Sequence, residues 1–370
     1  MSYNWQQIDW PRFKYDLREL EESLFSYAES LGRVDGMQQA LSEEAKKQAV
    51  IDMMVAEAIN TSEIEGEFLS RNDVLSSVRN NLGLNRIPER IKDKRAAGVA
   101  RLMVTIRETY AEELTEEALL SWHSMIMEGN QRINKGQWRS HSSPMQVVSG
   151  PIGREVVHFE APPSSAVPGE MERFIAWFNE TGPGKPHEIF HAPVKSAIAH
   201  LYFETIHPFE DGNGRVGRAI SEKALSQGIG RPVFLSLSRA IEAKRQEYYE
   251  ALKTAQRSNE ITPWIRYFLK ITLEAQKQAE SQIEFTLKKT RFFDHYRESL
   301  NERQEKVLSR MAEEGPDGFT GGMMSAKKYM SITKTSKATA TRDLQKLVDI
   351  GALRMLGEGR SIRYEINWRG

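Results

Sequence analysis

Apolar residues at helical spacing run through most of this 370-residue chain. Leu17, Leu20, Leu24 and Tyr27 recur three or four residues apart, which indicates the buried face of a helix. The same kind of pattern predicts helices over residues 16–30, 42–59, 88–110, 115–127, 169–179, 193–206 and 215–227, with further helices over 239–300. We therefore expect a mainly α-helical fold, and the length suits two or three domains.

One segment interrupts the helical pattern. Val147 and Val148 are followed by a turn sequence rich in Gly and Pro and then by Val156 and Val157. Apolar pairs on both sides of such a turn are typical of a β-hairpin. We expect a hairpin over residues 146–157. It could have a functional role or be an ordinary surface hairpin.

The last seventy or so residues have a different order of elements. Helices are expected over 302–313, 325–330 and 336–350, followed by two short strands around residues 357–360. This order is typical of a winged helix-turn-helix. We place an N-terminal helical domain at 1–110, a central domain at 111–285 and a winged helix-turn-helix domain at 290–370.

Charge is distributed unevenly although its sum is zero. The chain has 51 basic and 51 acidic residues, yet residues 320–370 carry ten Lys or Arg against four Asp or Glu. The chain has no cysteine, which excludes disulfides, thiol catalysis and Cys-ligated zinc. It shows no signal-peptide pattern and no run of eighteen apolar residues, so we expect a soluble, cytoplasmic protein without a membrane partner.

The segment HPFEDGNGRVGR, residues 207–218, combines a base, a carboxylate, glycines and two arginines between two helices. Glycines let backbone amides approach an anion, and the start of the following helix adds positive potential. Arg218 can direct its guanidinium at a phosphate, and Asp211 offers the hard oxygen ligands that suit Mg²⁺. His207 can accept a proton near neutral pH. The segment therefore predicts a phosphate site for phosphoryl or nucleotidyl transfer.

This segment resembles the HPFx(D/E)GNGRxxR signature of Fic-domain proteins at every fixed position, and the resemblance extends over about residues 110–285. Fic proteins mostly transfer AMP from ATP to a hydroxyl of a target protein. The resemblance implies that His207 deprotonates a Ser, Thr or Tyr hydroxyl, that Asp211 holds Mg²⁺ and that Arg218 grips the γ-phosphate. It also implies phosphate binding by Gly212, Asn213, Gly214 and Arg215. The related Doc kinases usually carry Lys at the position of Gly214, which favours AMP transfer here.

Two other segments fit this resemblance. Fic proteins have a flap that docks a target segment by strand addition, and the hairpin at 146–157 lies in the corresponding place. The segment TSEIEG, residues 61–66, resembles the family's inhibitory motif, (S/T)xxxE(G/N). The resemblance implies that Glu65 pairs with Arg218 and blocks productive binding of the γ-phosphate. The alternative interpretation is a helix end closed by a glycine.

A third segment resembles the adenine side of the family's site. Tyr248 and Tyr249 precede Gln256, where the family more usually has Asn. We take Tyr249 and Gln256 as candidates for nucleotide binding. Aromatic residues at helical spacing are also common in a protein core, and that alternative stays open.

Three other features are set aside. The HEIFH segment, residues 187–191, matches a zinc-binding HExxH pattern, but Pro193 should end the helix that both histidines require. Residues 212–217 fit GxGxxG, yet a helix precedes them rather than the strand of a dinucleotide fold. His200 is expected to be a buried, hydrogen-bonded core residue.

The C-terminal domain leaves two interpretations open. Lys334, Lys337 and Arg342 lie at or near the expected recognition helix, and Arg360 and Arg363 lie in the expected wing. Residues 334–363 would then bind DNA. The alternative is a wing that contacts another protein or a second copy of the chain, which would form a homodimer.

Together these features predict a protein adenylyltransferase that uses ATP and Mg²⁺ and is held inactive by Glu65. Two alternatives stay open. The same site could remove AMP, with Glu65 orienting a water molecule. The chain could also be a DNA-binding regulator whose Fic fold serves as a nucleotide sensor.

Overall fold

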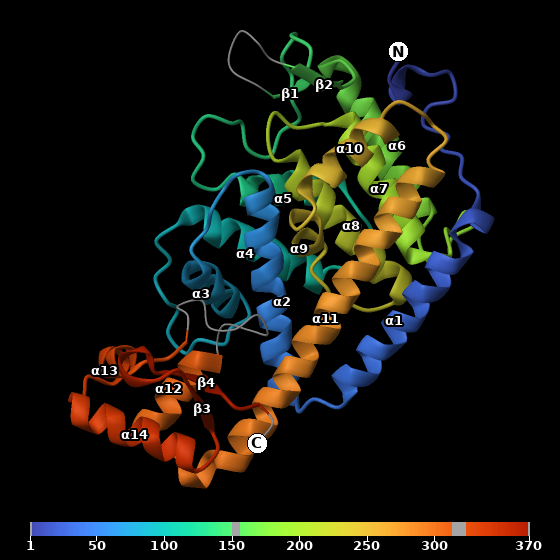
Figure 1. Cartoon of the computed structure of the whole chain (residues 1–370). Coiled ribbons are helices and arrows are strands. Elements are labelled where there is room, and N and C mark those ends of the chain that lie inside the picture. Colours follow the sequence, from blue (N-terminus) through green and yellow to red (C-terminus); the bar gives the residue numbers. More distant parts are fainter. Residues whose placement is uncertain (1, 150–155, 313–322, 369–370) are drawn as a thin grey trace. The chain divides into compact units, whose positions relative to one another are not determined.

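The computed structural model describes residues 2–149, 156–312 and 323–368, and these form α-helices and two small antiparallel sheets (Figure 1). The helices are α1 (Glu21–Gln39), α2 (Glu43–Ile64), α3 (Arg71–Asn81), α4 (Lys94–Glu108), α5 (Glu116–Ile126), α6 (Val167–Glu180), α7 (Ala192–Ile206), α8 (Asn213–Ile229), α9 (Leu237–Glu242), α10 (Arg245–Ala255), α11 (Thr262–Tyr296), α12 (Glu302–Ala312), α13 (Ala326–Thr333) and α14 (Lys337–Asp349). The strands are β1 (Gln146–Ser149), β2 (Val156–Glu160), β3 (Leu353–Leu356) and β4 (Arg363–Ile366). The prediction of a mainly helical chain with a small hairpin is confirmed.

The chain forms two compact units, one from Met1–Val34 with Val50–Ala279 and the other from Asp35–Ala49 with Glu280–Gly370. The boundaries at residues 110 and 285–290 stay predictions. In the part of the chain that the structure describes, no helix is both long and apolar enough to cross a bilayer.

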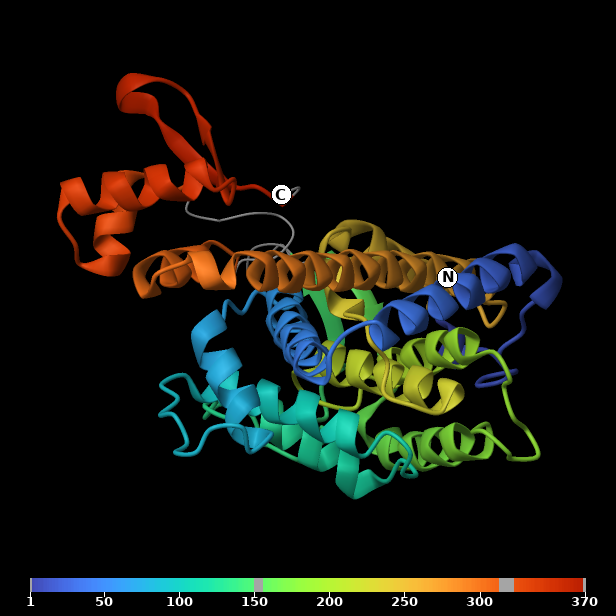
Figure 2. The ribbon, with the colours of Figure 1, turned by 90° about the horizontal axis from the view of Figure 1, so that it is seen from below.

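The first unit is built around α7. All 15 residues of α7 are buried, and a helix that is covered on every side belongs in the centre of a core. Helix α8 packs along α7, and α4, α5 and α6 complete the same core. The indole of Trp264, at the start of α11, donates a 2.7 Å hydrogen bond to the carbonyl of Ala197. The part of α11 that belongs to the first unit, residues 262–279, runs straight in Figure 2.

Capping residues and polar sequences explain where the helices differ from the prediction. Helix α3 was not expected, because its sequence RNDVLSSVRNN has few apolar residues; Ser70 caps its start. The helix expected from residue 88 begins at Lys94, because the Asp93 side chain caps the amide of Arg95 at 2.9 Å. The helix expected at 16–30 is a 3₁₀ turn, residues 17–20, followed by α1.

The segment matching HExxH is not helical, so its two histidines do not share the helical face that zinc binding requires, although no helix precedes Pro193 for it to end. Pro193 instead lies in the first turn of α7, where a missing backbone N–H carries no cost. In residues 2–149, 156–312 and 323–368, no group of three or more His, Asp or Glu side chains could hold a metal ion by itself.

In the second unit α12, α13 and α14 are followed by the β3–β4 hairpin, which pairs Leu353 with Ile366 and Leu356 with Arg363. The core of this unit includes Val307, Tyr329 and Leu344. The order of elements is the expected one, and the winged helix-turn-helix assignment stays a prediction.

Candidate functional site

A cavity of about 490 Å³ in the first unit gathers most of the predicted site residues. Its walls come from the end of α7, the following loop, the start of α8, α10 and the two strands of the hairpin (Figure 1). The predicted residues that line it are Glu65, His207, Asp211, Gly212, Asn213, Gly214, Arg218, Tyr249 and Gln256. Arg215 does not line it.

His207 ends α7 in a left-handed conformation, with φ 50° and ψ 59°. This conformation is costly for a residue with a side chain, and the surrounding structure must maintain it. Burial, followed by the charge of Arg139, lowers the pKa of His207 to about 4. The ring is therefore neutral near pH 7, as a proton acceptor must be.

Two residues that the sequence did not single out hold the loop in place. The Arg139 guanidinium is buried and donates to the carbonyls of His207 at 2.8 Å and Ile206 at 3.2 Å. The His123 ring stacks on Phe209 with ring centroids 3.9 Å apart. Its Nδ1 accepts from the amide of Gly136, so its Nε2 donates to the carbonyl of Asp211 at 3.2 Å. Neither residue lies in a local pattern that would have indicated this role.

The loop from 208 to 212 is closed by side chain to backbone hydrogen bonds. The Asn213 amide donates to the carbonyl of Phe209 and accepts from its N–H, both at 2.9 Å. The side chain of Asn213 therefore shapes the loop, and its backbone N–H is what remains for an anion. Gly212 adopts φ 84°, a conformation that glycine reaches without strain, and it begins α8. The first amides of α8 consequently face the cavity without acceptors inside the helix.

Asp211 fits a single-carboxylate Mg²⁺ site. Its side chain is 49% exposed at the cavity, and Oδ1 accepts a 2.6 Å hydrogen bond from Gly212, which orients the carboxylate. Mg²⁺ is usually bound by one or two carboxylates together with substrate phosphates and water. The residues present suit that arrangement.

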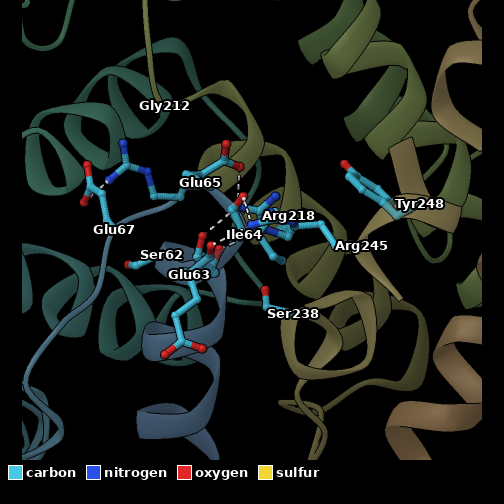
Figure 3. Close-up of polar contacts among 12 residues, drawn as sticks. Ser62, Glu63, Ile64, Glu65, Glu67, Gly212, Arg218, Ser238, Arg245 and Tyr248 are labelled. Carbon is cyan, nitrogen blue, oxygen red and sulfur yellow. Dashed lines mark hydrogen bonds and ion pairs between the residues drawn. The ribbon is translucent and has the colours of Figure 1, made fainter. Parts of the chain in front are cut away.

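Glu65 lies at the start of α8 and pairs with Arg218 (Figure 3). Its Oε1 is 2.8 Å from Nη2 of Arg218, and the buried guanidinium also donates to the side chain and carbonyl of Thr61 at 2.8 and 2.9 Å. Burial would lower the pKa of Arg218, but the charge of Glu65 outweighs it and raises the pKa above its usual value. A Cβ at Gly214 would lie only 2.2 Å from Oε1 of Glu65. The carboxylate therefore occupies the position where an anion would meet the helix start.

Glu65 follows Ile64, the last residue of α2, and Gly66 comes next with φ 78°. The backbone of TSEIEG therefore forms the end of a helix, as the alternative interpretation expected, while the side chain of Glu65 forms the ion pair. Arg245 donates to the carbonyls of Glu63 and Ile64 at 3.3 and 3.5 Å, and Tyr249 donates to that of Ile64 at 3.4 Å. The end of α2 is thus attached to α10.

Arg215 has a different surrounding from the one expected. Its guanidinium is buried outside the cavity and donates to Oε2 of Glu67 at 3.1 Å, with Asp211 Oδ1 3.8 Å away. In Figure 3, Glu67 lies on the side of Glu65 opposite Arg218. The structure therefore does not present the Arg215 side chain to a phosphate in the cavity.

The predicted adenine side is half-buried. Tyr249 is partly exposed at the cavity, and Gln256 is buried and donates to the carbonyl of Glu204 at 3.2 Å. Tyr248 is buried, and its hydroxyl lies 2.7 Å from Nε2 of His200. The expectation of a buried, hydrogen-bonded His200 is confirmed.

The flap strands pair antiparallel, from Gln146 with Glu160 to Ser149 with Val156. Val147, Val148 and Phe159 line the cavity, so the flap forms one of its walls. Residues 150–155 of the predicted hairpin lie outside the described residues.

Comparison with known proteins agrees with this geometry. Residues 113–225 match the Fic/DOC family, and residues 3–84 match a domain of unknown function, DUF4172. A crystal structure of a Fic family protein from Desulfovibrio desulfuricans aligns with a TM-score of 0.54 at 20% identity, over 94% of this chain and 97% of the other. The fold is of the Fic type.

Curated relatives are also similar to part of the chain. Protein adenylyltransferase Fic of Nematostella vectensis is 28% identical over 162 residues, which are 44% of this chain and 33% of the relative. The protein of the same name from Drosophila ananassae is 29% identical over 164 residues, 43% of this chain and 28% of the relative. The chain thus spans about a third of the length of these relatives.

Proposed function

We propose that the first unit is a protein adenylyltransferase that transfers AMP from ATP to a hydroxyl of a target protein. The observation that carries this proposal is a cavity in which His207, Asp211 and the start of α8 face one another, with an internal carboxylate at the anion position. The Fic-type fold and the relatives named protein adenylyltransferase support it.

The residues divide the work by position. The amides at Gly212–Gly214 and the Arg218 guanidinium bind the phosphates, Tyr249 and Gln256 border the adenine, and Asp211 would hold Mg²⁺, which supplies charge neutralisation. Because Nδ1 of His207 is buried, Nε2 is the nitrogen that meets the target hydroxyl. The hydroxyl oxygen attacks the α-phosphorus, its proton passes to Nε2 and pyrophosphate leaves. A target segment adds to a free edge of the flap.

Glu65 holds this site inactive because it competes with the γ-phosphate for Arg218. A guanidinium whose Nε and Nη2 are committed to Thr61 and to the Glu65 carboxylate has only the N–H groups of Nη1 left for a phosphate. Removal of the carboxylate frees both the guanidinium and the helix start above Gly214.

The test is labelling with α-³²P-ATP and Mg²⁺, with and without cell lysate. We expect transfer to rise about tenfold to a hundredfold in Glu65→Gly, and to disappear in Glu65→Gly combined with His207→Ala. Glu63→Gly is the matched control, since it removes a carboxylate from the same helix turn without touching Arg218. Equal labelling by wild type and Glu65→Gly would contradict the inhibition, and no labelling by any variant would contradict the activity.

AMP removal at the same site uses the same residues in reverse, with Glu65 at the cavity wall orienting a water molecule. Incubation of AMP-modified protein with wild type and Glu65→Gly distinguishes the two directions. Removal by wild type alone would favour this alternative.

A second function, DNA binding, is favoured by one face of α14. Lys337, Thr341, Arg342, Gln345 and Lys346 are exposed together along this helix. Basic and amide side chains on one helix face suit phosphates and base edges. We expect a gel shift that weakens with salt and is lost in Lys337→Glu/Arg342→Glu, whereas Lys306→Glu on α12 retains it. If DNA binding does not depend on salt, or if no DNA binding is seen, the surface would instead contact a protein partner.

A further inference from the structure

Glu204 lies one helical turn before His207 and faces it inside the cavity wall. Its side chain is 6% exposed, and its Oε2 is 3.7 Å from Nδ1 of His207. Among the described residues, Oε1 of Glu204 has no hydrogen-bond partner and Nδ1 of His207 has none of ordinary geometry, although the His207 ring also interacts with the backbone of Glu204. Buried polar atoms normally have partners, so two such atoms on neighbouring side chains need an explanation.

Gly217 makes the room that the carboxyl of Glu204 occupies. A Cβ at this position would lie 2.4 Å from Oε1 of Glu204. Gly217 sits inside α8 without a positive φ, so its backbone does not require glycine, and glycine inside a helix is destabilising relative to alanine. Glycine at position 217 therefore leaves space for the Glu204 carboxyl.

The charges around Glu204 come from several elements. Arg218 faces it from α8, Glu65 from the end of α2 and Tyr248 from α10. Burial, moderated by Arg218 and reinforced by Glu65, raises the pKa of Glu204 to about 8. His207 has its pKa lowered to about 4 by burial. Below pH 8 a proton that would ordinarily belong to the histidine therefore resides on the carboxyl.

We propose that Glu204 is the positioning residue of His207, an inference that rests on the proposed AMP transfer. The ionised carboxylate closes the 3.7 Å gap and accepts a hydrogen bond from Nδ1–H of His207. This fixes the tautomer whose Nε2 carries a free electron pair, as a carboxylate does for a catalytic histidine in hydrolases.

The proton balance of the step is simple. When the target hydroxyl attacks the α-phosphorus, its O–H bond breaks, the new O–P bond forms and pyrophosphate leaves with the electron pair. The proton stays on Nε2, and the imidazolium so formed faces the carboxylate of Glu204 through Nδ1–H. Glu204 stabilises this charge and can accept the Nδ1 proton, because its carboxyl has the higher pKa of the two groups.

The kinetic test uses Glu65→Gly as the parent, so that inhibition does not mask the effect. We expect Glu204→Ala and Glu204→Gln to lower kcat on the order of a hundredfold, with KM for ATP changed less than about threefold. Gly217→Ala should lower kcat in the same way. The parent's kcat should rise toward pH 8 as Glu204 ionises, and this limb should be absent in Glu204→Gln.

The matched control is Glu170→Gln, which alters another buried glutamate, on α6, that does not line the cavity. It should leave kcat and the pH profile of the parent unchanged. If Glu204→Gln behaves like Glu170→Gln, the inference is overturned. If the parent itself transfers no AMP, the proposed function fails, and a second measurement decides on Glu204.

That second measurement needs no turnover. In protein with ¹⁵N-labelled histidine, the ring signals of His207 are those missing from His207→Ala. We expect these signals to change with a midpoint near pH 8 in wild type and Glu170→Gln, but not in Glu204→Gln, because the change reports ionisation of Glu204 beside Nδ1. A wild type without this step, or a Glu204→Gln variant that retains it, would overturn the inference whether or not the protein transfers AMP.

Discussion

The two arginines of α8 have nearly the same burial but opposite relations to the cavity. Arg218 and Arg215 are each 1% exposed, and each pairs with a glutamate from the segment that follows α2. The Glu65–Arg218 pair borders the cavity, whereas the Glu67–Arg215 pair lies outside its lining. A buried guanidinium requires a partner, but only the first pair lies where a phosphate can take the place of the carboxylate. The comparison separates an exchangeable contact from a structural one.

Their other hydrogen bonds differ in the same direction. Without Glu65, Arg218 would keep its two hydrogen bonds to Thr61. The hydrogen bond that Arg215 makes is to Glu67, and its Nε has no partner among the described residues. Asp211 is 3.8 Å away from Arg215 and half-exposed, so it compensates weakly. The loss of Glu67 should therefore cost folding stability, and the loss of Glu65 should change activity.

The largest expected effect is on stability. We expect Glu67→Ala to lower the free energy of unfolding by about 3 kcal/mol, because it leaves a buried charge without its partner. Glu65→Ala should lower it by about 1 kcal/mol, since Arg218 keeps Thr61 and borders an open cavity. Urea unfolding measures both values, and Arg215→Met/Glu67→Leu is the control that removes both charges. Equal losses for the two single variants would erase the distinction.

A smaller effect concerns the activity that each pair controls. Glu65→Ala should raise AMP transfer at least tenfold, and Glu67→Gln, which keeps a hydrogen-bond acceptor for Arg215, should leave it within about twofold. Labelling with α-³²P-ATP at matched concentrations of folded protein measures both. A rise in Glu67→Gln as large as in Glu65→Ala would show that Arg215 is also released for phosphate.

How much of this could be predicted from the sequence follows from chain distance. Residues 207–218 are contiguous, so the phosphate site could be predicted from their spacing. Helices α7 and α8 could be predicted from the helical periodicity of their apolar residues. Glu67, Arg139 and Glu204 gain their meaning from contacts with partners that periodicity does not indicate. The phosphate role predicted for Arg215 could not be checked against Glu67, which lies 148 residues away. The polar helix α3 lacked the apolar face from which helices are recognised.

The pH dependence of stability should also distinguish the two glutamates. The pKa of Glu204 is raised to about 8, so the unfolded chain releases this proton at lower pH than the folded protein. The free energy of unfolding therefore falls as pH rises from about 4.5 to 8, by about 1.4 kcal/mol for each unit of pKa shift. Glu65 is one cause of the raised pKa and Glu67 is not.

We therefore expect the decline in unfolding temperature between pH 5 and pH 9 to be shallower in Glu65→Ala than in wild type. Glu67→Ala should keep the slope of wild type at a lower temperature. Thermal unfolding at several pH values measures this, with Glu204→Gln as the variant in which the slope is most reduced. Parallel curves for all four proteins would mean that Glu65 has no influence on the buried carboxyl.

The smallest expected effect tests how the end of α2 is attached to α10. Arg245 donates to the carbonyls of Glu63 and Ile64 at 3.3 and 3.5 Å, long contacts at a partly exposed site. A cation at the C-terminal carbonyls of a helix contributes about 0.3 to 1 kcal/mol. Arg245→Ala should therefore loosen Glu65 and raise AMP transfer about twofold, while Arg245→Lys, which keeps the charge, should raise it less. Because Arg245 acts only through Glu65, the substitution should have no effect in a Glu65→Ala background; an effect that persists there would place Arg245 in the nucleotide site instead.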